Sequence, residues 1–295
     1  MKILVAYDGS NCADAAVEDM LRAGLPSEAE CFVVCVTEHP SPENMAEADA
    51  LARNAAARIQ SYFPEWTLST EALSGPPAAT ILDASRSWKT DLLIVGSHGR
   101  SRIKRLLLGS VSMELIHKAR CSVRVGRPER SRVAGPLRIV VGNDGSTAAQ
   151  AVVQEIARRS WPESTEVRVV SVVESLVPAG DPLAEGAFST ETAFQVIEEA
   201  DIHEWNRLRT VAEESASLLR HAGLKASMTI TEADPRQELI AEAYRIDADA
   251  IFVGACGHGR LERLLLGSVS AAAVTRAHCA VEVVRHDVNV IPRVS

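Results

Sequence analysis

The amino-acid sequence predicts an α/β protein made of two tandem domains, each with a doubly wound sheet of five parallel strands. Three observations lead to this prediction. Apolar strand-like runs alternate with helical patterns along the chain, segment 96–112 recurs at 254–270, and in both copies that segment places a glycine-rich loop directly after a buried strand. Such alternation is typical of parallel sheets with crossover helices.

The internal repeat defines the organisation of the chain. Its two copies, GSHGRSRIKRLLLGSVS and GACGHGRLERLLLGSVS, are identical at 11 of 17 positions and lie 158 residues apart. The same offset pairs Pro77 with Pro235, whereas an offset of 136 pairs Asp8 with Asp144. The second copy is therefore 22 residues longer between its second and third strands.

Each copy contains five apolar runs that are expected to be strands. They lie at 3–7, 31–37, 67–73, 92–95 and 123–125 in the first copy, and at 139–142, 167–173, 227–231, 250–253 and 281–284 in the second. A charged segment with Pro and Gly follows the first set, as is typical of a linker. We therefore expect a first domain over 1–127, a linker over 128–137, a second domain over 138–286 and a C-terminal tail over 287–295.

The additional length of the second copy predicts a loop followed by a long helix. The Pro- and Gly-rich stretch 175–191 has no periodicity, so we expect a mobile loop. Apolar residues then recur at helical spacing from Phe194 to Leu219, which predicts one amphipathic helix. We expect Trp205 to pack into the core from that helix.

Composition and charge exclude several classes of function. A net charge of -8 argues against a general nucleic-acid binder, which needs a basic face. No window approaches the roughly 20 apolar residues of a membrane span, and the first apolar run is too short for a signal peptide, so we expect a cytoplasmic protein. The six cysteines show no CxxC spacing and are expected to be reduced, and no metal site is predicted.

The repeated loop has the chemistry of a phosphate site. Its spacing is Gly-x2-Gly-x9-Gly-Ser, with Gly96, Gly99, Gly109 and Ser110 in one copy and Gly254, Gly257, Gly267 and Ser268 in the other. Glycine lets a phosphate approach main-chain N–H groups closely. The Gly-Ser pair then opens a helix, where free N–H groups favour an anion and where the serine can cap the helix. Arg100, Arg102, Lys104 and Arg105 add positive charge to the first loop, and Arg260 and Arg263 to the second. The alternative is that the glycines only make turns and caps, with the cations on a solvated face.

An aspartate follows the first strand of each copy. If the first and fourth strands are neighbours where the strand order reverses, Asp8 and Asp144 each face their own glycine loop. A carboxylate there can accept a hydrogen bond from a ribose hydroxyl or an adenine amino group. The alternative is that Asp-Gly-Ser only turns the chain and caps the next helix.

These motifs closely resemble the universal stress protein family, whose ATP-binding branch carries this glycine spacing and an early Asp. The resemblance covers nearly the whole chain, twice, and implies Rossmann-like domains of the adenine-nucleotide alpha-hydrolase-like kind. It also implies ATP, with or without Mg²⁺, as the ligand, and an internal pseudo-dimer formed through the last strands, with a homodimer of chains left open. By this resemblance and the repeated loop, the first site comprises Asp8, Val36, Gly96, Gly99, Arg100, Gly109, Ser110, Val111 and Ser112. The second comprises Asp144, Val172, Gly254, Gly257, His258, Gly267, Ser268, Val269 and Ser270.

The sequence also departs from the family and differs between its copies. Ser122 and Ala280 stand where a Pro commonly precedes the last strand, and His98 in the first loop corresponds to Cys256 in the second. Cys256 is either a small loop residue or, in a cationic loop, a thiol of lowered pKa that senses oxidants. The two sites are therefore expected to differ in affinity.

Three functions remain open at this point. The first is an ATP-binding regulatory module of the stress response that acts on a protein partner. The second is a slow ATPase or phosphotransferase, although the loops lack the Gly-Lys-Ser/Thr of a Walker A motif and no catalytic residue is predicted. The third is a scaffold that binds no nucleotide.

Overall fold

The computed structural model describes residues 1–99, 108–128, 135–174, 190–257 and 266–285. In the first half the elements are β1 (Lys2–Ala6), α1 (Asn11–Asp19), the short 3-10 helix Met20–Arg22, β2 (Glu30–Thr37), α2 (Pro42–Tyr62), β3 (Thr67–Ser74), α3 (Pro77–Trp88), β4 (Leu92–Gly96), α4 (Ser110–Lys118) and β5 (Ser122–Gly126). In the second half they are β6 (Arg138–Gly142), α5 (Thr147–Arg158), β7 (Glu166–Val173), α6 (Thr190–His221), β8 (Lys225–Glu232), α7 (Pro235–Arg245), β9 (Ala250–Gly254), α8 (Ser268–Arg276) and β10 (Ala280–Val284). The expected strands are therefore all present.

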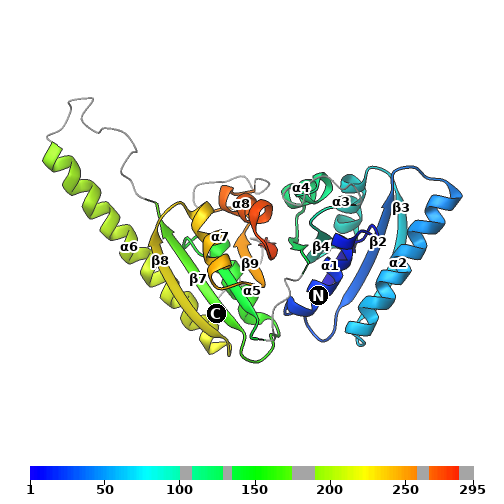
Figure 1. Cartoon of the computed structure of the whole chain (residues 1–295), viewed down its shortest axis with the longest axis horizontal. Helices are drawn as coiled ribbons and strands as arrows, with labels where there is room; N and C mark the ends of the chain where they lie inside the picture. The colour runs from blue at the N-terminus through cyan, green and yellow to red at the C-terminus, as the bar shows by residue number, and fades with distance from the viewer. Residues whose placement is uncertain (100–107, 129–134, 175–189, 258–265, 286–295) are drawn as a thin grey trace, which may run out of the picture.

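Within the described residues the strands form one ten-stranded sheet in the order β3-β2-β1-β4-β5-β10-β9-β6-β7-β8. Each half is parallel and doubly wound, with β1 beside β4 and β6 beside β9. The halves join where β5 and β10 pair antiparallel, with Val123 opposite Val283 and Arg124 opposite Glu282. Figure 1 shows the two halves side by side, with α2 and α6 at the far edges. The predicted fold class, including the pairing of the last strands, is confirmed.

Helices cover both faces of the sheet. On one face, α1 and α2 enclose a core against β1 and β2 that includes Val17 and Ile59. The second half has the equivalent core under α5 and α6, which includes Ile156 and Leu219. On the other face, α3, α4, α7 and α8 share one core that continues from one half into the other. The two halves are thus joined by apolar packing as well as by strand pairing.

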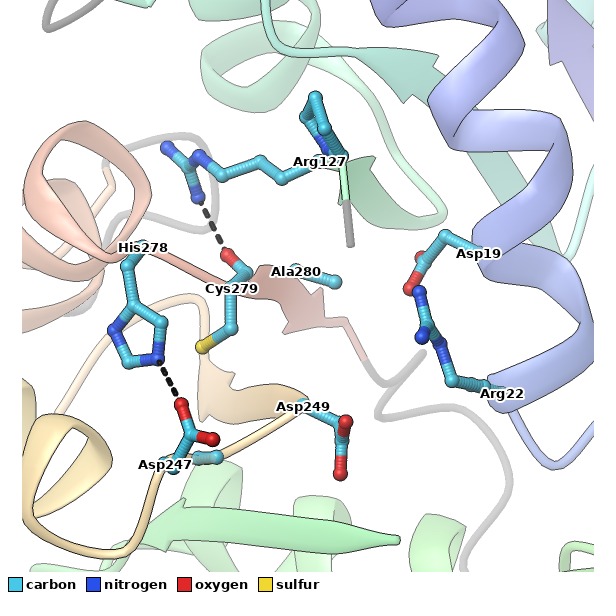
Figure 2. Close-up of a pocket in the computed structure, with 10 residues that line it drawn as sticks. Asp19, Arg22, Arg127, Asp247, Asp249, His278, Cys279 and Ala280 are labelled. Carbon is cyan, nitrogen blue, oxygen red and sulfur yellow. Dashed lines mark hydrogen bonds and ion pairs between the residues drawn. The ribbon is translucent and has the colours of Figure 1, made fainter. Parts of the chain in front are cut away.

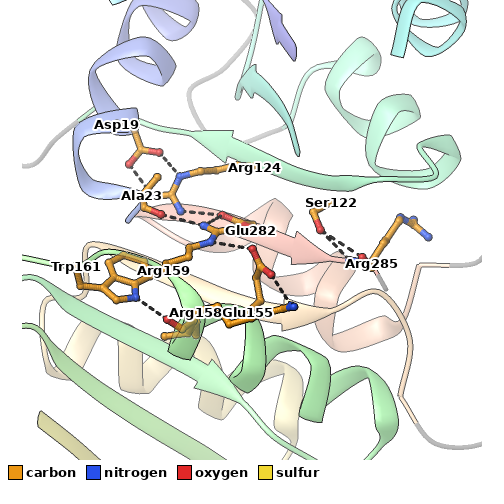
Figure 3. A network of polar contacts seen from close by, with 11 residues as sticks. Asp19, Ala23, Ser122, Arg124, Glu155, Arg158, Arg159, Trp161, Glu282 and Arg285 are labelled. Carbon is orange, nitrogen blue, oxygen red and sulfur yellow. Dashed lines mark hydrogen bonds and ion pairs between the residues drawn. The ribbon is translucent and has the colours of Figure 1, made fainter. Parts of the chain in front are cut away.

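Charged side chains are buried at the junction of the halves (Figure 3). The Arg124 guanidinium donates to Asp19 from Nε and Nη2, at 2.6 and 3.1 Å, and to Glu282 from Nη1 at 3.2 Å. Arg159 donates to the same Glu282 carboxylate and, from Nη1, to the Ala23 carbonyl of the other half. Arg124 and Glu282 are fully buried. Burial alone lowers the pKa of Arg124, but the charges and hydrogen bonds of the two carboxylates raise it above its usual value.

Two arginines cross the junction in equivalent positions. Arg127, just after β5, donates to the carbonyls of Cys279 and Val274 in the second half. Arg285, just after β10, donates from Nη2 to the Ile116 carbonyl in the last turn of α4, at 2.7 Å. A cation at the C-terminal end of a helix stabilises that helix. Each half therefore supplies an arginine that binds a carbonyl in the last turn of the final helix of the other half.

The extended second copy forms the long α6, as predicted from its periodicity. Of the expected loop, residues 175–189 lie outside the described residues, and Thr190 already belongs to the helix. The expectation for Trp205 was wrong, because this side chain is 37% exposed. The helix reaches the core one turn later, at Leu208, which is 2% exposed. No helix in the described part of the chain is long and apolar enough to cross a membrane.

Candidate functional site

The reversal of strand order lies between β1 and β4 in the first half and between β6 and β9 in the second. In a doubly wound sheet this is where the strand ends leave a crevice. Asp8 follows β1 and Gly99 follows β4, and a Cβ atom on Gly99 would lie 3.0 Å from Asp8 Oδ2. The corresponding distance from Gly257 to Asp144 Oδ2 is 2.5 Å. Each aspartate therefore faces its own glycine loop, as the sequence predicted.

A cavity of about 520 Å³ lies at the crevice of the first half. Its lining includes Asp8, Val36, Gly96, Gly99, Gly109, Ser110, Val111 and Ser112. Arg100 and the other loop cations of this half lie outside the described residues. The structure thus brings together every predicted site residue of this half that it describes.

The second half holds an equivalent cavity of about 690 Å³. Its lining includes Asp144, Val172, Gly254, Gly257, Gly267, Ser268, Val269 and Ser270. His258 and the two arginines of this loop lie outside the described residues. Both cavities have the size of small-molecule sites, about 300–1,000 Å³.

The first glycine of each loop is required by close packing. A Cβ on Gly96 would lie 2.7 Å from the backbone carbon of Cys12 in α1, and one on Gly254 would lie 2.8 Å from Ala148 Cβ in α5. The hydroxyl of Ser112 donates to the Gly96 carbonyl at 2.8 Å. The hydroxyl of Ser270 donates to the Gly254 carbonyl at 2.6 Å. These two serines thus fix the strand end and the following helix to each other.

The helix that closes each loop begins differently from the prediction. We expected Ser110 and Ser268 to cap their helices, but each serine is the first helical residue and the preceding Gly109 or Gly267 is the N-cap. Neither helix has a side-chain hydrogen bond at its cap. Because the first N–H groups of a helix have no partner within it, they are open to an anion in the cavity.

The backbone holds each loop in place. The Gly109 N–H donates to the Ser97 carbonyl at 2.8 Å, and the Gly267 N–H donates to the Ala255 carbonyl at 2.7 Å. A Cβ on Gly109 would lie 3.3 Å from His98 Cα, so the loop segments pass close to one another. The two loops therefore share one geometry as well as one sequence pattern.

Several cavity residues were not identified from the sequence. Glu47 lines the first cavity from α2, and Glu204 and Arg207 line the second from α6. Pro77 and Pro235 open α3 and α7 and also line the cavities. The 158-residue offset pairs the two prolines, and this pairing was the available sign that they belong to the sites. The residues of α2 and α6 follow a different offset, so the repeat did not identify them.

The two loops differ where His98 corresponds to Cys256, and both residues line their cavities. Burial, followed by the nearby charge of Arg127, lowers the pKa of His98. The His98 imidazole is therefore neutral at pH 7, with Nδ1 3.2 Å from the Ser97 hydroxyl.

A third cavity lies at the junction of the halves, where Arg127, His278 and Asp247 surround it (Figure 2). Its volume is about 30 Å³. That is room for about one water molecule, so we do not consider it a ligand site. No cluster of three or more potential metal-binding side chains occurs in the part of the chain that the structure describes.

Comparisons with known proteins agree with this division into halves. Residues 1–127 and 137–285 each match the model of the universal stress protein family. A universal stress protein of Mycolicibacterium smegmatis is 28% identical over 303 residues, which cover 96% of each chain. One from Mycobacterium tuberculosis is 29% identical over 225 residues, which cover 74% of this chain and 69% of the relative.

Solved structures show the same fold. The crystal structure of a universal stress protein from Archaeoglobus fulgidus superposes with a TM-score of 0.64 at 19% identity, over 97% of this chain and 98% of the other. A functionally unknown protein from Pseudomonas aeruginosa superposes with a TM-score of 0.65 at 16% identity, over 97% of this chain and 92% of the other. At these identities the likeness concerns the fold alone.

Proposed function

The chain belongs to the universal stress protein family, and we propose that each half binds one adenine nucleotide, ATP in the cellular setting. The observation that carries the proposal is the pair of cavities at the strand-order reversals. Each lies between a carboxylate and a helix N-terminus that follows a glycine loop and has no side-chain hydrogen bond at its cap. Turns and caps alone do not require both copies to keep the same glycines, serine and facing aspartate.

The phosphates would lie on the glycine loop. The first residues of α4 and α8 line the cavities, and the partial positive charge of a helix N-terminus favours an anion. Gly99 and Gly257 leave room for the approach, because a side chain at either position would meet the facing aspartate. Mg²⁺ would neutralise the triphosphate, with Ser110 and Ser268 within the same cavities.

The nucleoside would lie toward β2 and α3, or β7 and α7 in the second half. Val36 and Ile81 give the first cavity an apolar side there, as Val172 and Leu239 do in the second. A planar base suits such a surface, and a nearby carboxylate can accept a hydrogen bond from a ribose hydroxyl. With the base and the phosphates so placed, the ribose would lie near Asp8 in the first half and near Asp144 in the second.

We propose a regulatory rather than an enzymatic role for the bound nucleotide. The glycine loops have no Walker lysine, and we assign no base to activate a water. A nucleotide that contacts both the glycine loop and the following helix would favour one arrangement of the two and so change the surface offered to a protein partner.

The test is to purify the full chain without added nucleotide, denature it and identify released nucleotides by chromatography. Titration calorimetry with Mg-ATP on emptied protein then gives the stoichiometry. We expect two sites in the wild type and one each in the Gly109→Val and Gly267→Val chains, which serve as controls for each other. No nucleotide released and no Mg-ATP bound would refute the proposal.

A further inference from the structure

The helices α2 and α6 occupy equivalent places over the two half-sheets, and their buried residues define a common register. Ala52 corresponds to Ala212, and Ile59 corresponds to Leu219, all four with 0% exposure. Both pairs are 160 residues apart. This offset therefore aligns the helix that borders the first cavity with the helix that borders the second.

In this register a negative charge in the first cavity becomes a positive charge in the second. Glu47 corresponds to Arg207, and each lines its own cavity. One turn toward the N-terminus, Asn44 corresponds to Glu204, and these also line the cavities. The two sites share their phosphate loops but differ in charge where α2 and α6 line the cavities.

The Arg207 guanidinium is held beside the aspartate of the second site. It donates from Nε and Nη2 to the Glu204 carboxylate, at 2.7 and 2.6 Å. Nη2 also donates to the Asp144 main-chain carbonyl at 3.1 Å. Nη1 lies over Gly145, whose φ is +80°, and a Cβ there would be 2.6 Å from it. The arginine is thus positioned by three hydrogen bonds and by a glycine that leaves room for it.

Glu204 occupies only one edge of the guanidinium. No acceptor for Nη1 occurs among the described residues, so this nitrogen can donate to a ligand. The Arg207 side chain is 33% exposed, within reach of the cavity. A charge-assisted hydrogen bond from a guanidinium N–H to a phosphate oxygen is stronger than one between neutral groups, which makes a phosphate a suitable ligand for Nη1.

The position of Arg207 determines which phosphate it would meet. If the 5′-phosphates lie on the glycine loop, as under the proposed function on which this inference rests, the ribose lies at Asp144. Related dinucleotide-binding folds use a carboxylate to accept a free ribose hydroxyl and an arginine to bind a phosphate on that hydroxyl. The exchange of Glu47 for Arg207 is a change of this kind within one chain.

We propose that the second site selects an adenine nucleotide with a phosphate ester on its ribose, whereas the first site selects one with free ribose hydroxyls. The ribose phosphate would accept from Nη1 of Arg207. In the first site Glu47 stands in the place of Arg207, so the same phosphate would lose the arginine contact and meet a carboxylate instead.

The experiment uses full chains with one site blocked. The Gly109→Val chain reports the second site, and the Gly267→Val chain reports the first. Calorimetry compares AMP with adenosine 2′,5′-bisphosphate and adenosine 3′,5′-bisphosphate, which distinguishes the two ribose positions. We expect the second site to prefer a bisphosphate over AMP by about tenfold or more, as an added charge-assisted contact provides, and the first site to prefer AMP.

Substitutions then assign the preference to one side chain. Arg207→Met in the Gly109→Val chain should remove the difference in affinity between the bisphosphate and AMP, and Arg207→Lys should retain part of it. Arg209→Met, at an exposed position of the same helix, is the matched control and should change nothing. In the Gly267→Val chain, Glu47→Arg should shift the preference toward the bisphosphate.

The outcomes separate this inference from the proposed function. Equal bisphosphate-to-AMP ratios in the two blocked chains, or a preference that survives Arg207→Met, would overturn the inference while leaving nucleotide binding in place. Failure of both blocked chains and of the wild type to bind any adenine nucleotide would overturn both.

Discussion

Replacing Arg124 by methionine should destabilise the folded chain strongly. The substitution removes two hydrogen bonds to Asp19 and one to Glu282, all buried between the halves. Hydrogen bonds to charged groups contribute about 1.5–3 kcal/mol each, and burying the methionine returns about 1.5–3 kcal/mol. Glu282 keeps Arg159, whereas Asp19 loses both bonds from Arg124. We therefore expect a loss of about 3–5 kcal/mol, the usual result of breaking a buried ion pair.

The measurement is urea unfolding of the full chain followed by circular dichroism, with wild type and variant at one protein concentration. The midpoint should fall, with the slope showing whether the halves still unfold together. Arg158→Met is the matched control, because that arginine is 64% exposed and pairs only with Glu155 in the contacts described, so its loss should be within about 0.5 kcal/mol. A loss below about 1 kcal/mol for Arg124→Met would refute the reasoning.

Three further perturbations follow from the packing. Gly96→Ala places a Cβ against the Cys12 backbone and should cost about 1–3 kcal/mol in urea unfolding; an unchanged midpoint would contradict the close approach. Burial raises the pKa of Cys31 and Cys279 from 9.0 to about 12, so iodoacetamide at pH 8 should label neither thiol in folded protein, as peptide mass spectrometry would show. Unfolded thiols ionise near pH 9.0, whereas the folded ones ionise only near pH 12. These thiols therefore leave the free energy of unfolding unchanged below pH 9 and lower it as the pH rises from 9 toward 12. Labelling of Cys31 or Cys279 would contradict their burial. Arg285→Met removes the hydrogen bond to the last turn of α4 and should lower the free energy of unfolding by about 1–2 kcal/mol in urea unfolding. An unchanged free energy of unfolding would contradict a stabilising role for that hydrogen bond.

Patterns that recur in both copies could be read from the sequence, because each copy supports the other. The apolar runs predicted where the strands lie. Once β1 and β4 are taken as neighbours, their ends predict that Asp8 faces Gly99, without any knowledge of side-chain contacts. The domain boundaries and the ligand remain predictions, since neither follows from the arrangement of strands. The fold was predictable because parallel pairing of apolar runs leaves few topologies open.

Features that differ between the copies could not be predicted in this way. Arg124 and Glu282 stand at equivalent positions inside apolar runs, and a charge inside such a run was the available signal for a buried pair. Arg207 was hidden because the helices align at 160 residues rather than 158. Trp205 was misjudged because periodicity tells which helix face is apolar but not how far the sheet extends beneath it.

The antiparallel pairing of β5 with β10 brings together equivalent positions of the two copies, and in a single chain these positions can carry different residues. In a dimer of identical subunits, a residue on the two-fold axis meets its own copy, so a buried arginine there would meet another arginine. Joining the copies in one chain removes this restriction, and the position opposite Arg124 could become Glu282. Each half is now complementary to its partner rather than to itself. Because each copy now has its own sequence, this position no longer has to be identical in the two halves, as it would in a homodimer. For the same reason the two cavities can carry different residues.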